Sequence, residues 1–218
     1  MPLTPFRRRF GAAALACAVA AMPWSVAAET IDRVLAVAAG ELIMLSDVTA
    51  ARDLGLVAPD PTAPDPIRAV LAKLIDRELV LAEVERYAPA EPAAEAIDRE
   101  LQIVRARFAT PQAFDAALAR SGIDENHLRE TLRQNLRIRA YEDQRFTVPA
   151  PSDEELHAYF SNHTRMFARD GQSPAFEDVR ADIARAVSVE KHDALVEEWI
   201  AGLRRRADII DLYLLPVR

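Results

Sequence analysis

The sequence is poor in the residue types that build covalent and metal sites. Cys17 is its only cysteine, so no disulfide can form within the chain. None of its four histidines belongs to a His-Glu-x-x-His pattern or a similar metal-binding spacing. No serine lies in a Gly-x-Ser-x-Gly setting, the context of many serine nucleophiles. We therefore expect no catalytic residue, no metal site and no bound cofactor.

Basic charge is also in short supply. The chain carries a formal net charge of -7, with 34 acidic residues against 27 lysines and arginines. Proteins that bind nucleic acids need a basic surface, so nucleic acid is not an expected partner. The run Arg204 to Arg206 could face an acidic partner or an anionic membrane surface. Because it ends a predicted helix, compensation of the helix dipole is the simpler interpretation.

No apolar run reaches the length of about 20 residues that a membrane-spanning helix requires. The run Phe10 to Met22 follows three arginines and precedes the small residues Ser25 to Ala28. This order of charge, apolar core and small residues is typical of a secretory signal peptide. We therefore predict a signal peptide over 1–28, cleavage near Ala28, and a periplasmic or secreted product. A lipoprotein modified at Cys17 and export by the twin-arginine route are the alternatives.

Glycine is scarce as well, with six residues, whereas alanine, leucine, glutamate and arginine dominate. This composition favours helices, and prolines clustered at 59–66, 89–92 and 149–151 separate them. Apolar residues recur every three or four positions along six stretches, which predicts helices with one buried face. The predicted stripes are Ile67, Val70, Leu71, Leu74, Ile75 and Leu79; Ile97, Leu101, Val104 and Phe108; Phe114 and Leu118; Leu128, Leu132, Leu136 and Tyr141; Leu156, Tyr159, Phe160, His163 and Phe167; and Phe176, Val179 and Ile183.

Helix starts are marked by side chains that can accept hydrogen bonds from the free N–H groups of a first turn. We expect such caps at Ser46-Asp47, at Asp65 before Pro66, at Thr110 before Pro111, at Asp124, and at Ser152 with Glu155 as a capping box.

Two strand segments are expected at opposite ends of the sequence. Arg33 to Leu45 consists of two short apolar runs joined across Ala39-Gly40, which predicts a β-hairpin. Ile209 to Leu215 is apolar and short, and a single strand needs a partner, so we expect it to pair with the hairpin. The predicted fold class is mainly α: a multi-helix core with a small β-sheet made from an N-terminal hairpin and a C-terminal strand.

Three regions, in this order, carry a resemblance to a known family. The first is the hairpin, with Ile31-Asp32-Arg33-Val34, Gly40-Glu41 and Ser46-Asp47-Val48. The second is Leu74-Ile75-Asp76-Arg77-Glu78-Leu79-Val80, followed by Phe114, Leu118 and Ser121-Gly122-Ile123. The third is the helix pair in 152–186, followed by Trp199-Ile200, Leu203 and the strand at Ile209. Together they resemble the SurA-like periplasmic chaperones, the SurA N-terminal and trigger factor–SurA peptide-binding domain family. Ala39 departs from the family, in which asparagine usually precedes the turn glycine.

The resemblance implies a helical, peptide-binding core over 29–218, with an N-terminal part (29–150) and C-terminal helices and strand (151–218). It also implies binding of unfolded outer-membrane or secreted polypeptides without ATP. In such proteins a parvulin prolyl-isomerase domain is inserted where this chain has only the segment 168–175. An independently folding domain needs at least roughly 50 residues, so eight cannot contain one. We therefore expect no isomerase activity.

The aromatic and methionine side chains beside this linker are the candidate contacts with client peptides: Tyr159, Phe160, Met166 and Phe167. Such side chains adapt to varied partners. Because three of them belong to a helical stripe, packing in the protein core is the competing interpretation. The alternative function is a non-catalytic interaction subunit that holds one dedicated partner. An enzyme comes third, since no set of convergent polar groups supports it. The oligomeric state stays open.

Overall fold

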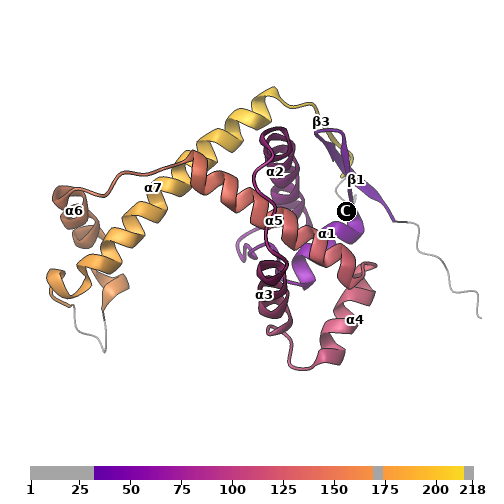
Figure 1. The fold of residues 1–218 in the computed structure, drawn as a ribbon, viewed down its shortest axis with the longest axis horizontal. Coiled ribbons are helices and arrows are strands. Elements are labelled where there is room, and N and C mark those ends of the chain that lie inside the picture. The colour runs from indigo at the N-terminus through magenta and orange to yellow at the C-terminus, as the bar shows by residue number, and fades with distance from the viewer. Residues whose placement is uncertain (1–31, 169–173, 214–218) are drawn as a thin grey trace, which may run out of the picture. The chain divides into compact units, whose positions relative to one another are not determined.

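The computed structural model describes residues 32–168 and 174–213 (Figure 1). The predicted signal peptide and the centre of the predicted linker lie outside these residues. The predicted fold class is confirmed, since the described residues form seven α-helices, one short 3-10 helix and one three-stranded antiparallel sheet. None of these helices combines the length and apolar character that crossing a membrane would require. In chain order the elements are β1 (Val34–Ala38), β2 (Glu41–Met44), α1 (Leu45–Asp53), α2 (Pro66–Tyr87), α3 (Ala94–Arg105), α4 (Pro111–Ser121), α5 (Glu125–Arg145), α6 (Asp153–His163), η1 (Thr164–Phe167), α7 (Phe176–Arg206) and β3 (Ile209–Asp211).

The predicted hairpin is present as β1 and β2. Ala39 and Gly40 form its two-residue turn with φ angles of 52° and 88°, the left-handed values of a type I′ turn. Glycine adopts such angles without strain, whereas alanine does so at a cost of roughly 1–2 kcal/mol. The strands pair antiparallel, with Val37 opposite Leu42. The hairpin therefore forms in register although its turn lacks asparagine.

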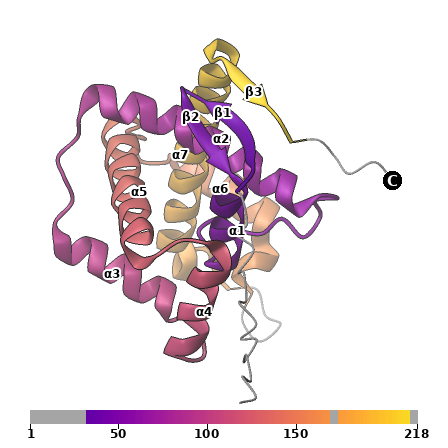
Figure 2. The ribbon, with the colours of Figure 1, turned by 90° about the vertical axis from the view of Figure 1, so that its right-hand side faces the viewer.

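The predicted pairing of the hairpin with the C-terminal strand is confirmed. β3 runs antiparallel to β1, so that β1 is the central strand in the order β2-β1-β3 (Figure 2). The N–H of Leu212 donates to the carbonyl of Leu35 over 2.9 Å. Arg68 Nη2, from α2, lies 2.5 Å from Asp211 Oδ2. Both β1 and α2 therefore hold the last strand in place.

The predicted acceptors at the start of the first helix are confirmed for Asp47 and wrong for Ser46. α1 begins at Leu45 with Met44 as N-cap, and Asp47 Oδ2 accepts a hydrogen bond from the Met44 N–H over 2.8 Å. Ser46 lies inside the first turn, where its hydroxyl donates to the Asp32 carboxylate. The reason is that β2 runs into α1 without a connecting loop, so the last strand residue takes the cap position.

The other predicted helix starts are confirmed. The acceptors are Asp65 Oδ1 for Arg68 N–H at 3.0 Å, Thr110 Oγ1 for Ala113 N–H at 3.1 Å, Asp124 Oδ1 for His127 N–H at 2.8 Å, and Ser152 with Glu155 as a reciprocal capping box. These bonds explain why the helices begin where the sequence indicates, since each satisfies an N–H that has no partner within its own helix.

Two residues that the sequence placed on buried helix faces lie differently in the structure. α3 ends at Arg105, so Phe108 lies beyond the helix, although its ring still packs 5.6 Å from that of Phe114. In α5 Leu136 is only half-buried, and the neighbouring Arg137 is buried. The arginine Nε lies 3.4 Å from the Glu91 carboxylate, which gives the buried guanidinium a charged neighbour, but this nitrogen makes no hydrogen bond within the described residues.

Three separate clusters of buried apolar side chains hold the elements together. A central cluster joins the sheet, α1 and α2 with Tyr141 of α5 and Leu203 of α7. A second cluster joins α1 with α3, α4 and α5. The α6–α7 cluster consists of Leu156, Val179, Ile183 and Val187. The long helix α7 therefore packs into the central cluster near its C-terminal end and holds α6 near its N-terminal end.

The predicted role of Arg204 to Arg206 can now be refined. Arg204 forms an ion pair with Asp76 of α2, and its Nη2 donates to the Ala72 carbonyl over 2.7 Å. Arg205 and Arg206 are exposed. Arg204 thus links α7 to α2 by an ion pair and a hydrogen bond, and it also lies at a helix C-terminus, where cations are favoured.

Candidate functional site

Three of the four predicted peptide-contact residues pack inside the protein. Tyr159, Phe160 and Phe167 are half-buried against the α6–α7 cluster. The ring of Phe160 lies 5.7 Å from that of Phe176 and 6.2 Å from that of Phe167, distances typical of aromatic packing. These rings hold α6 and η1 against α7, as the core interpretation of the stripe expects.

The fourth predicted contact, Met166, has 70% of its surface exposed. It lies in η1, beside the three packed rings, so a flexible apolar side chain faces solvent next to an aromatic cluster. Of the four candidates, Met166 is the side chain most available to a partner.

The histidines near this cluster serve packing. The ring of His157 stacks on Phe176 at 3.9 Å, and that of His163 stacks on Tyr159 at 4.2 Å. Over the described part of the chain, no three His, Cys, Asp or Glu side chains gather closely enough to hold a metal ion.

A groove at another place was not predicted. It encloses about 510 Å³ between β2, α1, α2 and α5, and we name it the β2 groove. Its volume falls in the range of about 300–1,000 Å³ that ligand sites in proteins usually have. Its apolar lining is formed by Leu42, Ile43, Met44, Ala50, Ala51, Leu56, Val57, Leu74 and Ile123. Such a surface offers contact area to apolar side chains of a ligand.

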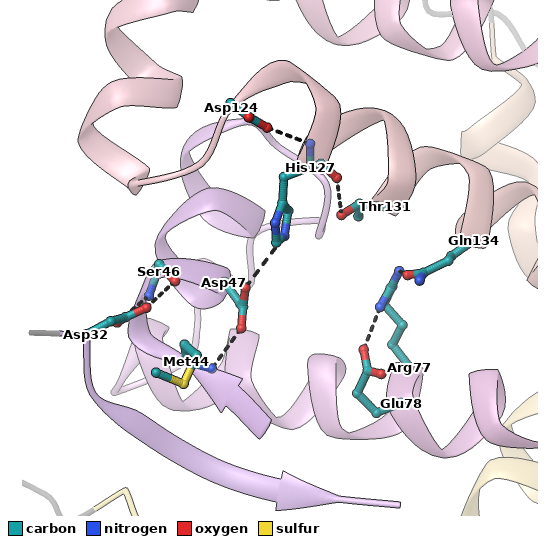
Figure 3. Close-up of polar contacts among 10 residues, drawn as sticks. All are labelled: Asp32, Met44, Ser46, Asp47, Arg77, Glu78, Asp124, His127, Thr131 and Gln134. Carbon is teal, nitrogen blue, oxygen red and sulfur yellow. Dashed lines mark hydrogen bonds and ion pairs between the residues drawn. The ribbon is translucent and has the colours of Figure 1, made fainter. Parts of the chain in front are cut away.

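Arg77 forms one polar wall of the β2 groove (Figure 3). From α2, its Nε donates to Asn135 Oδ1 over 2.9 Å and its Nη2 to Gln134 Oε1 over 2.6 Å, so it bridges to α5. Its Nη1 lies 2.5 Å from Glu78 Oε1. Burial nevertheless raises the pKa of the Glu78 carboxyl, against the opposing effect of Arg77. This wall is fixed by three contacts before any ligand arrives.

His127 and Asp47 lie across another part of the groove. Figure 3 shows His127 of α5 pointing toward Asp47 of α1, with 3.9 Å between Nε2 and Oδ1. The nearby Ser46 hydroxyl donates to Asp32 and not to the imidazole. A serine nucleophile needs a base within hydrogen-bond reach, and His127 does not fill that role for Ser46 here. The arrangement therefore suits binding better than nucleophilic catalysis.

Negative charge predominates along the groove. Its lining carboxylates are Glu41, Asp47, Glu78 and Glu130, and its lining cations are Lys73 and Arg77. Two carboxylates have strong partners: Glu78 has Arg77, and Glu130 Oε1 accepts from Arg133 Nη2 over 2.6 Å. This leaves Glu41 and Asp47, on β2 and α1, against the single cation Lys73, so the lining keeps an excess of one negative charge.

The sequence contained one sign of this groove. Asp76-Arg77-Glu78 is a run of three charged residues between Ile75 and Leu79 of the apolar stripe of α2. Two of them point to other elements: Asp76 pairs with Arg204 of α7, and Arg77 bonds to α5. This charged run alone could not reveal which elements would lie opposite.

The described fold was compared with known proteins. No family model and no curated protein matches the sequence. Among solved structures, one similar chain comes from work on the virulence factor PEB4 and the periplasmic protein Cj1289, two structurally related SurA-like chaperones of the human pathogen Campylobacter jejuni. The sequences are 13% identical, the TM-score is 0.50, and the match covers 83% of this chain and 99% of the other. What this chain shares with those SurA-like chaperones is therefore the fold.

Proposed function

We propose that this protein is an ATP-independent chaperone that binds unfolded outer-membrane or secreted polypeptides and has no prolyl-isomerase activity. The observation that carries the proposal is the β2 groove, an open site with an apolar lining and a charged rim on a SurA-like fold. A site of this composition can take up apolar side chains while hydrogen-bonding the polar groups between them. Met166 adds a second apolar contact on η1.

The absence of isomerase activity is proposed from the chain length between two helices. Phe167 ends η1 and Phe176 begins α7, which leaves eight residues where a domain would need at least roughly 50. A proline-peptide isomerisation assay tests this part directly. A rate above the uncatalysed background would contradict it.

The proposed location is the periplasm, after removal of residues 1–28. It is supported by the order of arginines, apolar core and small residues at the N-terminus. Cell fractionation, together with mass spectrometry of the N-terminus, would identify the compartment and the cleavage position. A product that keeps residues 1–28 in the cytoplasm would contradict the proposal.

The deciding experiment measures aggregation of an outer-membrane protein diluted from urea. The chain lacking residues 1–28, at several-fold molar excess, should lower the light scattering without added ATP. No reduction would count against a chaperone, and a single stoichiometric partner recovered by pull-down would then favour a dedicated interaction subunit.

A matched pair of variants tests the contribution of Met166. Met166→Asp should weaken the suppression of aggregation because it places a charge on the exposed apolar side chain. Asn162→Asp, at an exposed position in α6, adds the same charge without removing apolar surface. Both variants should melt as the unmodified chain does. Equal activity of the two variants would exclude Met166 as a client contact.

A further inference from the structure

The outer edge of β2 is open. In the sheet order β2-β1-β3, β2 pairs with β1 on one side, and no described strand pairs with it on the other. The N–H of Leu45 donates to the Arg33 carbonyl, toward β1, and successive peptide groups of a strand alternate in direction. The N–H and C=O of Leu42 and Met44 therefore point away from β1. Asp47 already accepts the Met44 N–H, so Leu42 offers the donor and acceptor pair of this edge.

This open edge borders the β2 groove. All four residues of β2, from Glu41 to Met44, line the groove, including neighbours whose side chains point to opposite faces of the sheet. A cavity lined by successive residues of one strand, whose side chains alternate between the two faces, borders the edge of that strand. The facing wall is α5, with His127 and Gln134. The space between the two walls can thus hold an extended chain beside β2.

β2, of four residues, contains no proline and no lysine, two of the residues that usually protect an edge strand. Natural sheets shield their edges with prolines, lysines, short strands or covering segments. Strand β3, at the other edge, is only three residues long and ends in Asp211, which pairs with Arg68. β2 instead carries Leu42, with 58% of its surface exposed, followed by Ile43 and Met44. It is the edge better suited to accept another strand.

The charge of the groove indicates what kind of segment would bind. Asp47 has only the 3.9 Å approach of His127 among the ion pairs of the described residues. The charges of Glu41 and Asp47 add to the effect of burial in raising the pKa of Glu78, so the three carboxylates share one negative field. A lysine or arginine side chain in the groove would be attracted by this field.

We propose that the β2 groove binds an extended segment of another polypeptide as an added strand along the Leu42 edge, and prefers segments with alternating apolar residues and a basic residue. Main-chain hydrogen bonds to Leu42 would supply affinity for many sequences, as in other cases of strand addition. The apolar lining and the excess negative charge would supply the preference. This inference rests on the proposed function, because it assigns to that function a site and a class of ligand.

The test uses a fluorescent peptide of alternating valine and lysine or threonine, with binding to the full mature chain followed by anisotropy. N-methylation of alternate peptide nitrogens on one edge removes the donors that would face β2, and the same change on the other edge does not. One of the two methylated peptides should bind about tenfold more weakly, since hydrogen bonds at Leu42 are lost. A third peptide, with glutamate in place of lysine, should also bind more weakly.

Protein variants give a second, independent readout. Leu42→Pro removes the outward N–H but no hydrogen bond to β1, and Leu42→Ala removes the side chain but keeps the N–H. The proline variant should bind the unmethylated peptide more weakly than the alanine variant does. Glu41→Gln should reduce the preference for lysine over glutamate. If Leu42→Pro fails to fold, the methylated peptides alone still decide, because they leave the protein unchanged.

The possible outcomes separate the two proposals. If the chain suppresses aggregation but binds both methylated peptides as well as the unmodified one, strand addition is wrong and the proposed function stands. If methylation of one peptide edge weakens binding and methylation of the other does not, but the chain fails to suppress aggregation, the edge site stands and the proposed function is wrong. A dimer that dissociates on adding peptide would show that a second copy occupies the edge, which would overturn the inference of a client segment.

Discussion

The separation of the α6–α7 cluster from the other two clusters predicts that α6 can be released without unfolding the rest. Ile183 is fully buried in this cluster. Ile183→Ala removes three carbon atoms, each contributing about 0.8 kcal/mol by burial, and leaves a cavity, so we expect a local loss of about 3 kcal/mol. α6 has 11 residues, a length at which an isolated helix is marginal in water. It should therefore open much more often once its packing is weakened.

Hydrogen exchange followed by mass spectrometry measures this effect. The exchange rate of α6 amides should rise about 100-fold, since 1.4 kcal/mol corresponds to a factor of ten. The amides of α2 should change little. Leu71→Ala is the matched control, because Leu71 is equally buried but belongs to the central cluster, and it should increase exchange throughout. Equal increases in α6 and α2 for Ile183→Ala would refute the reasoning, because they would mean that the clusters unfold together.

Three further predictions concern the stability of the whole protein. Ala39→Asn should raise the free energy of unfolding by about 1 kcal/mol, since asparagine tolerates left-handed angles better; an unchanged or lower urea midpoint would contradict this. Asp76→Asn should lower it by about 1–2 kcal/mol, because Arg204 loses its charged partner, and thermal melting should detect this loss; a melt unchanged from that of the parent chain would show that the pair contributes nothing. Burial raises the pKa of Glu78, so the folded state binds a proton at this carboxyl more tightly than the unfolded state does. The protonated carboxyl therefore favours folding at low pH, and this contribution is lost as the pH rises through the raised pKa. Relative to Glu78→Gln, the unmodified chain should therefore lose stability in urea titrations as the pH rises above 4.5, the ordinary pKa of a glutamate, and a relative gain would be the opposite of what burial predicts.

The parts of the fold that the sequence predicts well are those specified by neighbouring residues. The turn at Ala39-Gly40 and the cap at Asp65 each depend on a few adjacent positions, and the structure has them where expected. The pairing of β3 with β1 was predicted for a different reason: a lone strand requires a partner, and the hairpin was the available one. The exception is Ser46: α1 begins one residue before it, at Leu45, so Met44 takes the cap position and the serine hydroxyl donates to Asp32 instead.

The candidate site was harder to predict because it depends on contacts between distant segments. The β2 groove brings together Leu42, Arg77 and His127, from three elements that are far apart in the sequence. The helical stripe through Tyr159 and Phe160 correctly indicated one buried face. Which ring would be covered, and that Met166 would stay exposed, depended on where α7 packs, which periodicity along α6 does not contain.

The central position of β1 has a consequence for the order in which the chain is made. β1 and β2 emerge from the ribosome early, whereas the partner of the other β1 edge, Ile209 to Asp211, is added only after seven helices. Until then, β1 carries an unpaired edge formed largely by apolar residues, a surface prone to pairing with other chains. Closing the sheet requires a contact across almost the whole described sequence, which is slow compared with helix formation. Synthesis that stops before 209–211 would therefore leave a chain with its helices able to form but its sheet open, so closure of the sheet waits for these three residues.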